Sequence, residues 1–245
     1  MKILFTLSIC LLSALTWAQQ TQGTIVFEQK MNLHRQMKGD NESMKAMVPE
    51  FRTMRQQLLF TPEASLYKAI EEEEDEAEME GSRGGIRMRF GASNDELYRD
   101  LVNRKRIEKR EFMGTEYLLE DTLMTSPWKL ATERKSVMGI DCMKATLSDT
   151  ARHREITAWF APTIAVPAGP DMYSSLPGMV LEVDINDGEI VIKAISADWK
   201  KPSEKALKAP KGGKQVTAEE FKQIMDEQLK KMGVPPGGGI RMIRN

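Results

Sequence analysis

The chain has 245 residues, of which 41% are hydrophobic and 29% are charged, and its 35 basic and 36 acidic residues give a net charge of −1. This composition is typical of a globular protein and excludes a disordered chain. The balanced charge gives no electrostatic basis for binding nucleic acid. The length suits one domain with one or two added elements.

Residues 1–18 have the pattern of a cleaved export signal. Lys2 supplies the positive start, residues 3–15 form an apolar core, and Ala18 ends a small-x-small cleavage site. The apolar core is too short for a transmembrane helix, and no later run reaches the necessary length. We therefore expect a periplasmic or secreted protein without a transmembrane segment, whose mature chain begins at Gln19.

Removal of the signal also removes Cys10 and leaves Cys142 as the only cysteine of the mature chain. An internal disulfide is then impossible, so the stability of the protein must come from its core. A single cysteine in an apolar stretch is usually a small buried hydrophobic side chain.

Residues 19–200 predict one antiparallel β domain. Short runs rich in β-branched and aromatic residues alternate with Gly, Pro and Asp, which is typical of a meander. The first predicted strand is Gly23–Asn32, and the last hairpin has an Asn-Asp-Gly turn at residues 186–188. Apolar residues recur at nearly helical spacing from Met44, and they predict one short helix that has Pro49 in its first turn and runs to about Gln56.

Two charged segments interrupt this domain. Eight of the ten residues 71–80 are acidic, and we interpret them as a solvated insertion, with a calcium site or a basic partner as the alternatives. Residues 103–110 are strongly basic and are interpreted as a strand that faces the acidic insertion.

The sequence after residue 200 differs in composition. Residues 201–216 are rich in Lys, Pro and Gly and are interpreted as a linker. Thr217 and Glu220 form a capping box at the start of an amphipathic helix over residues 217–232, whose apolar stripe predicts packing on the β domain. Residues 233–245 are interpreted as a flexible tail, in which GGGIRM echoes GGIRM at residues 84–88.

Residues 158–184 combine proline, glycine and large apolar side chains more densely than any other part of the chain. Trp159, Gly169-Pro170 and Leu176-Pro177-Gly178 lie in this stretch. Their motif resembles the signature of the GLPGLI family, which consists of exported Bacteroidota proteins, and further matches in the same order extend the resemblance over essentially the whole mature chain. The chain departs from the family at Ser175, where the family has glycine. The residues that carry the resemblance are Trp159, Gly169, Pro170, Leu176, Pro177, Gly178 and Cys142.

The resemblance implies a mainly β (α+β) fold. We expect a curved antiparallel sheet, or half-barrel, of about 8–11 strands with a short N-terminal helix and a C-terminal amphipathic helix. It implies no biochemical activity, and the signature residues are expected to have a structural role.

The sequence contains no recognisable catalytic constellation, metal motif or cofactor motif. The two histidines, His34 and His153, have no ligand-type neighbours at metal spacing. Cys142 and His153 could act together as nucleophile and base in a hydrolase, which is a remote alternative. We therefore expect a protein that is not an enzyme and needs no cofactor.

Two functions remain. The first is a binding or carrier module for an apolar ligand or an envelope component, in which a concave apolar face forms the cleft. The second is an accessory protein that interacts with an outer-membrane transporter and has no small-molecule site. The side chains expected at the cleft of the carrier are Trp128, Trp159, Phe160, Met172, Tyr173 and Met179.

Overall fold

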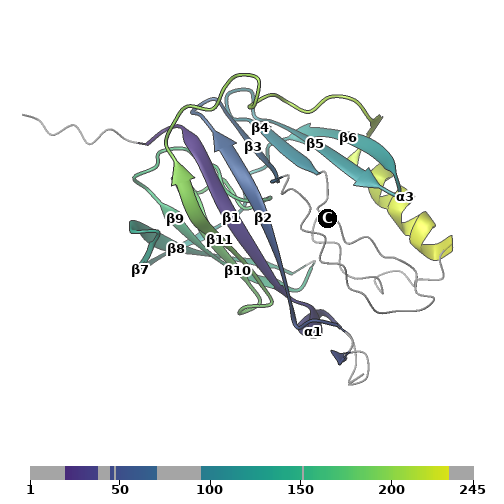
Figure 1. The fold of residues 1–245 in the computed structure, drawn as a ribbon, viewed down its shortest axis with the longest axis horizontal. Helices are drawn as coiled ribbons and strands as arrows, with labels where there is room; N and C mark the ends of the chain where they lie inside the picture. Colours follow the sequence, from purple (N-terminus) through teal and green to yellow (C-terminus); the bar gives the residue numbers. More distant parts are fainter. Residues whose placement is uncertain (1–19, 38–44, 47, 71–94, 151, 232–245) are drawn as a thin grey trace, which may run out of the picture.

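The computed structural model describes residues 20–37, 45–46, 48–70, 95–150 and 152–231. One sheet of twelve strands dominates them, with helices at its margins (Figure 1). The elements are β1 (Gly23–Asn32), α1 (Leu33–Gln36), β2 (Phe51–Phe60), β3 (Ala64–Ala69), β4 (Glu96–Asp100), β5 (Lys105–Phe112), β6 (Thr115–Thr122), β7 (Lys129–Val137), β8 (Ile140–Asp149), β9 (Arg154–Ala161), β10 (Met179–Ile185), β11 (Ile190–Asp198), β12 (Lys214–Val216) and α3 (Ala218–Lys231).

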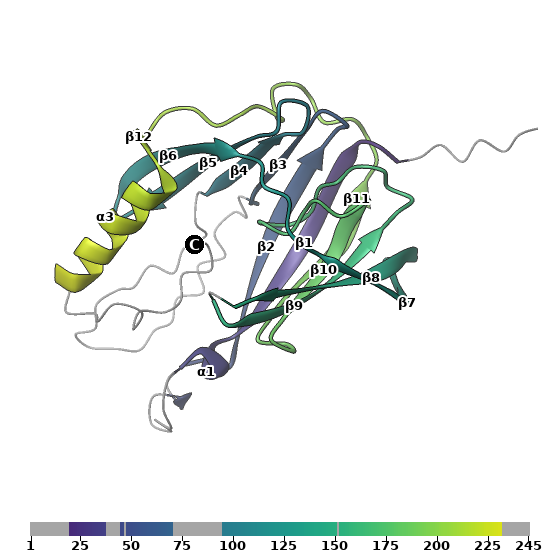
Figure 2. The same cartoon turned by 180° about the vertical axis from the view of Figure 1, so that it is seen from behind.

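The strands lie in the order β12-β6-β5-β4-β3-β2-β1-β11-β10-β9-β8-β7. Every pair is antiparallel except β12 with β6, which is parallel. The sheet is strongly curved, and the half that contains β3–β6 turns away from the half that contains β7–β9 (Figures 1 and 2). Its outermost strands, β7 and β12, do not pair with each other, so the sheet stays open. The predicted fold class is confirmed, with one strand more than the upper end of the predicted range.

The helix predicted from Pro49 to about Gln56 is wrong, because β2 begins at Phe51. Ten residues of β2 pair with β1 in unbroken register, from Phe51 opposite Asn32 to Phe60 opposite Gly23. Their backbone hydrogen bonds outweigh a local helical spacing that holds only four or five apolar side chains. The first described helix is α1 instead, and Asn32 caps it by accepting a hydrogen bond from the backbone N–H of Arg35.

The connection between β9 and β10 packs against the inner, concave face of the sheet and completes the main core. Ile164, Val166 and Ala168 are each at most 1% exposed. The backbone N–H groups of Met179 and Val180 donate hydrogen bonds to the carbonyls of Ile164 and Ala168. A proline-rich segment without regular structure is therefore part of the core itself.

The segment predicted as a linker includes β12 and so joins the sheet. Residues 200–213 cross above β3–β6 (Figure 1), where Pro210 is buried. The predicted capping box is confirmed: the Thr217 backbone N–H donates to the Glu220 carboxylate, and the Glu220 backbone N–H donates to the Thr217 hydroxyl. The helix that follows packs Phe221 and Met225 against β5 and β6.

At the other edge, β7 pairs with β8 irregularly. The register shifts between Leu130 and Arg134, so the middle of β7 bulges away from its neighbour. This edge strand carries Lys129, Glu133 and Lys135 in addition to Arg134. The predicted signal (1–18), acidic insertion (71–80) and tail (233–245) lie outside the described residues.

Candidate functional site

The segment between Pro162 and Gly178, called here the signature loop, passes so close to neighbouring backbone that two of its positions exclude any side chain. Gly178 has φ of +150°, and a Cβ there would lie 2.3 Å from the carbonyl oxygen of Ala161. At Gly169, a Cβ would lie 2.2 Å from the carbonyl oxygen of Tyr173. Real Cβ atoms do not approach oxygen this closely, so both glycines are required by packing.

Ser175 occupies a position whose backbone favours glycine. Its φ of +68° lies in the left-handed region, which costs a residue with a Cβ about 1 kcal/mol. The Ser175 hydroxyl accepts a hydrogen bond of 3.2 Å from the backbone N–H of Ser126. Next to it, the indole N–H of Trp128 donates to the carbonyl of Ser174 at 3.0 Å. The unfavourable backbone conformation of Ser175 is thus compensated by a contact that glycine cannot make.

Two buried arginines hold the signature loop from opposite walls of the curved sheet. Arg99 on β4 is 1% exposed, and its guanidinium donates a hydrogen bond to the backbone carbonyl of Asp171. Arg154 on β9 is also buried and lies beside the Tyr173 hydroxyl. Burial raises the pKa of Tyr173, Asp171 adds to that rise, and Arg154 opposes it. The loop is therefore fixed by charged groups at both sides as well as by its apolar side chains.

The residues predicted to line an apolar cleft do not share one surface. Phe160, Tyr173 and Met179 are buried in the main core, and Trp128 and Met172 are partly buried against it. Trp159 lies on the opposite face of the sheet, because it is opposite Glu182 on β10 whereas its neighbour Phe160 is opposite Val180. Trp159 is partly buried at the edge of the same core, and it does not line one surface with Phe160, since successive side chains of a strand alternate between faces.

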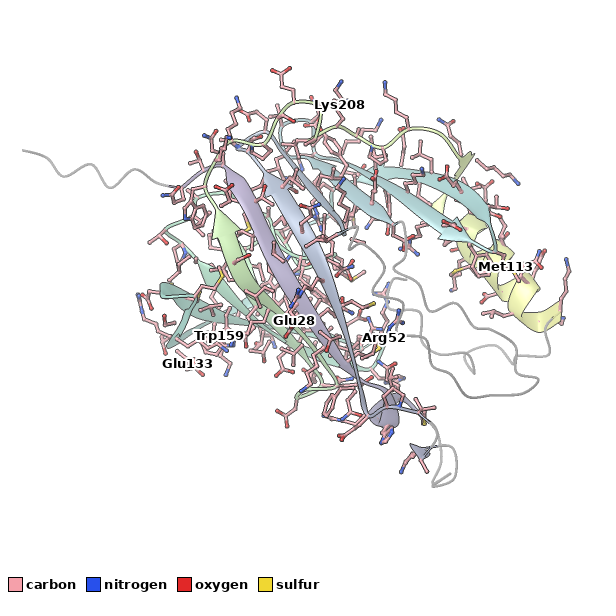
Figure 3. The ribbon with its side chains drawn as sticks, viewed as in Figure 1. Glu28, Arg52, Met113, Glu133, Trp159 and Lys208 are labelled. Atoms are coloured by element: carbon pink, nitrogen blue, oxygen red, sulfur yellow. The ribbon has the colours of Figure 1, made fainter. Side chains whose placement is uncertain are left out.

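On the outer face, Trp159 belongs to a polar cluster. The ammonium of Lys135 lies 4.8 Å from the centre of the Trp159 ring and forms an ion pair with Glu182. Lys144 is opposite Trp159 in the sheet and pairs with Glu133 on β7, and Figure 3 shows Trp159 and Glu133 in the same region. The aromatic ring thus packs beneath lysine side chains at the β7 edge.

Cys142 and His153 lie at opposite ends of β8. Cys142 is fully buried near the start of the strand, whereas His153 follows the far end at Asp149, about 23 Å away at 3.3 Å per residue. Burial raises the pKa of the Cys142 thiol to about 11, and the Asp141 and Glu182 carboxylates add to the rise. The two side chains are not brought together, and the thiol is held in its unreactive protonated form.

Among the described residues, no group of three or more His, Cys, Asp or Glu side chains could hold a metal ion. None of the described helices is long and apolar enough to span a membrane.

A groove lies around β12 at one end of the sheet, called here the β12–α3 groove. It consists of two hollows of about 250 Å³ each, which share Gln215, Val216 and Glu220. One hollow lies along α3, where Ile224 and Glu227 complete its wall, and the other lies toward β6. Both are shallow, so they suit a polypeptide segment better than an enclosed small molecule.

Sequence reasoning does not anticipate Arg99, Arg154 or the β12–α3 groove. The sequence does contain a clue to Arg99. It lies two residues after Leu97 in β4, so its side chain points to the same, apolar face of the strand. An arginine at such a position indicates a buried partner. No comparable signal marks β12, whose three residues pair in parallel with a strand nearly a hundred residues earlier.

Comparison with known proteins supports a similarity in fold and a short match in sequence. A family model described as "Protein of unknown function (Porph_ging)", a Bacteroidota-associated domain, matches residues 147–182, which include the signature loop. No curated protein matches the chain. Two structures of PNGF-II, in the C2 and P21 space groups, resemble this fold with TM-scores of 0.57 and 0.56 and 13% sequence identity.

These two structures cover 84% and 83% of this chain, which in turn spans 32% and 33% of theirs. At 13% identity the likeness concerns the fold alone.

Proposed function

We propose that this protein is an exported, non-enzymatic module of the GLPGLI type that binds another protein of the cell envelope. The observation that carries the proposal is that the signature loop packs its own side chains against the concave face on which a carrier would need its cleft. Ile164, Val166 and Leu176 of this loop are at most 1% exposed. A carrier for an apolar ligand needs a preformed apolar cavity instead.

The rigidity of the loop supports the same choice. Arg99 and the Gly178 contact with Ala161 fix the loop on both sides, so opening it for a ligand would strand buried polar groups. Among the described residues, the β12–α3 groove lies at the surface, where the sheet ends in a three-residue strand. Sheet edges of this kind accept an additional strand from a partner.

A hydrolase that uses Cys142 and His153 has less support, because about 23 Å of strand separates these residues. Burial of the thiol also disfavours the thiolate that such a mechanism requires. Export rests on the signal pattern of residues 1–18.

The proposal is tested by placing a photo-activated cross-linking amino acid at Gln215 or Gln223, both in the groove, in cells that produce the protein. Lys208, on the segment above β3–β4 (Figure 3), is the matched exposed control. We expect one discrete protein adduct from the two groove positions and none from the control. Native mass spectrometry of the purified protein completes the test: a stoichiometric co-purifying lipid, or the absence of any groove-specific adduct, would contradict the proposal.

A further inference from the structure

β12 is an edge strand that has one unpaired side within the described sheet. Within the described sheet its only neighbour is β6, so one side of its backbone can accept another strand. Alternate side chains of an added strand point to opposite faces. The two hollows of the β12–α3 groove flank β12 and share its residues Gln215 and Val216. A strand added here would therefore present its side chains alternately to the face of the sheet that carries α3 and to the opposite face, beside the two hollows.

The lining of the hollows selects the chemistry of that strand. Apolar surface comes from Val216 and Ile224 in the hollow along α3, and from Leu118 in the hollow toward β6. The carboxylates of Glu120, Glu220 and Glu227 lie around this surface. Among the residues that line the two hollows, Lys214 has the one ammonium group. Apolar and basic side chains together are complementary to such a lining.

The chain itself contains a segment of this composition, directly after α3. Residues 240–244 read Ile-Arg-Met-Ile-Arg, so an extended conformation presents apolar and basic side chains on both faces. The 14 residues of α3 span about 21 Å. The nine residues from Lys231 to Ile240 extend to about 30 Å. The segment is therefore long enough to return along α3 to β12.

We propose that residues 240–245 add to the free edge of β12 as an extended strand and occupy the β12–α3 groove in the resting protein. The docking itself stands on the geometry of the groove. Its regulatory consequence rests on the proposed function: a partner that uses the groove must displace this tail, and it does so with an extended segment that also carries apolar and basic side chains.

Disulfide trapping tests the docking in the full mature chain. Gln215→Cys is combined with Met242→Cys in a Cys142→Ala background, and the pair Lys208→Cys with Met242→Cys is the control. We expect an intramolecular disulfide between positions 215 and 242 at least tenfold more abundant than in the control. Equal yields would overturn the proposal. So would a disulfide that links two copies, or stronger trapping when Met88→Cys, in the echoed segment, replaces Met242→Cys.

A second measurement leaves the native thiol and the described residues unchanged. Ile243→Asp puts a carboxylate against the acidic groove, whereas Asn245→Asp adds the same charge at the last residue. Amide hydrogen exchange in Lys214–Val216 is expected to accelerate at least tenfold in Ile243→Asp and less than twofold in Asn245→Asp. Unchanged protection in Ile243→Asp would overturn the docking.

The two proposals fail separately. If the tail is trapped but no partner adduct forms from Gln223, even in Ile243→Asp, the docking stands and the proposed function fails. If an adduct forms from Gln223 with equal yield in the native chain and in Ile243→Asp, the proposed function stands and the tail does not compete for the groove. We expect the adduct to increase several-fold in Ile243→Asp.

Discussion

The guanidinium of Arg99 on β4 donates a hydrogen bond to the backbone carbonyl of Asp171, which lies 72 residues away in the signature loop. Both residues are at most 5% exposed. The bond crosses the concave face of the sheet and connects the β3–β6 half to the loop that packs on the other half. The loop is consequently a structural tie between the two halves.

Replacement of Arg99 by methionine should lower the free energy of unfolding by about 1–3 kcal/mol, because the Asp171 carbonyl loses its donor while it stays buried. Arg106→Met is the matched control: Arg106 is opposite Arg99 on β5, but its ion pair with Asp121 is partly exposed. An exposed pair contributes about 0.5 kcal/mol. Urea denaturation measures both variants, and equal losses would show that Arg99 does not tie the halves together.

Gly178→Val should abolish folding and secretion. Its Cβ would lie 2.3 Å from the Ala161 carbonyl oxygen, and relief would require the β9 and β10 backbones to separate. Gly139→Ala is the control that introduces backbone strain without a steric clash. Gly139 has φ of +78°, and a Cβ added there would meet no atom within 4 Å. That variant should lose only about 1 kcal/mol. Secreted yield and the melting temperature are the measurements, and normal values for Gly178→Val would refute the structural role of the motif.

Ser175 should tolerate glycine better than alanine. In Ser175→Gly the relief of the left-handed backbone, about 1 kcal/mol, offsets the lost hydrogen bond from Ser126. Ser175→Ala keeps the unfavourable φ and loses the hydroxyl, so it should be destabilised by about 1 kcal/mol. Thermal unfolding of both variants at the same pH gives the comparison. An alanine variant as stable as the glycine variant would leave the hydroxyl without a role.

Cys142 should be unreactive toward a disulfide reagent at pH 8 in the folded protein and should react at once after unfolding. Because burial raises the folded pKa to about 11, above the ordinary value of 9.0, its contribution to stability is complete below pH 9. That contribution is lost as the pH rises from 9 to 11. Denaturation curves of the native chain and of Cys142→Ala should therefore converge or cross over this interval, and parallel curves would be the contrary result.

Much of the fold follows from local pattern, whereas the site depends on distant pairings. Alternating side chains in β1 and β9 predict strands with one buried face, and Thr217 with Glu220 predicts the start of α3 from four residues. The helical spacing of apolar residues gives the wrong prediction for β2, because pairing with β1 determines the conformation of this segment. The composition of the signature loop predicts a segment that sets the path of the chain. Its partner Arg99 is not predictable in this way, because β3, β2, β1 and β11 separate β4 from β10 in the sheet.

The bulge and the charged side chains of β7 affect the tendency of the protein to aggregate. A straight, apolar edge strand would let neighbouring copies continue each other's sheets into fibrils. Here the register break between Leu130 and Arg134 disrupts the hydrogen-bonding template, and the charged side chains beside it disfavour pairing with an identical edge. Growth from this side is blocked, so a protein with an open twelve-stranded sheet can accumulate at high concentration without polymerising through β7.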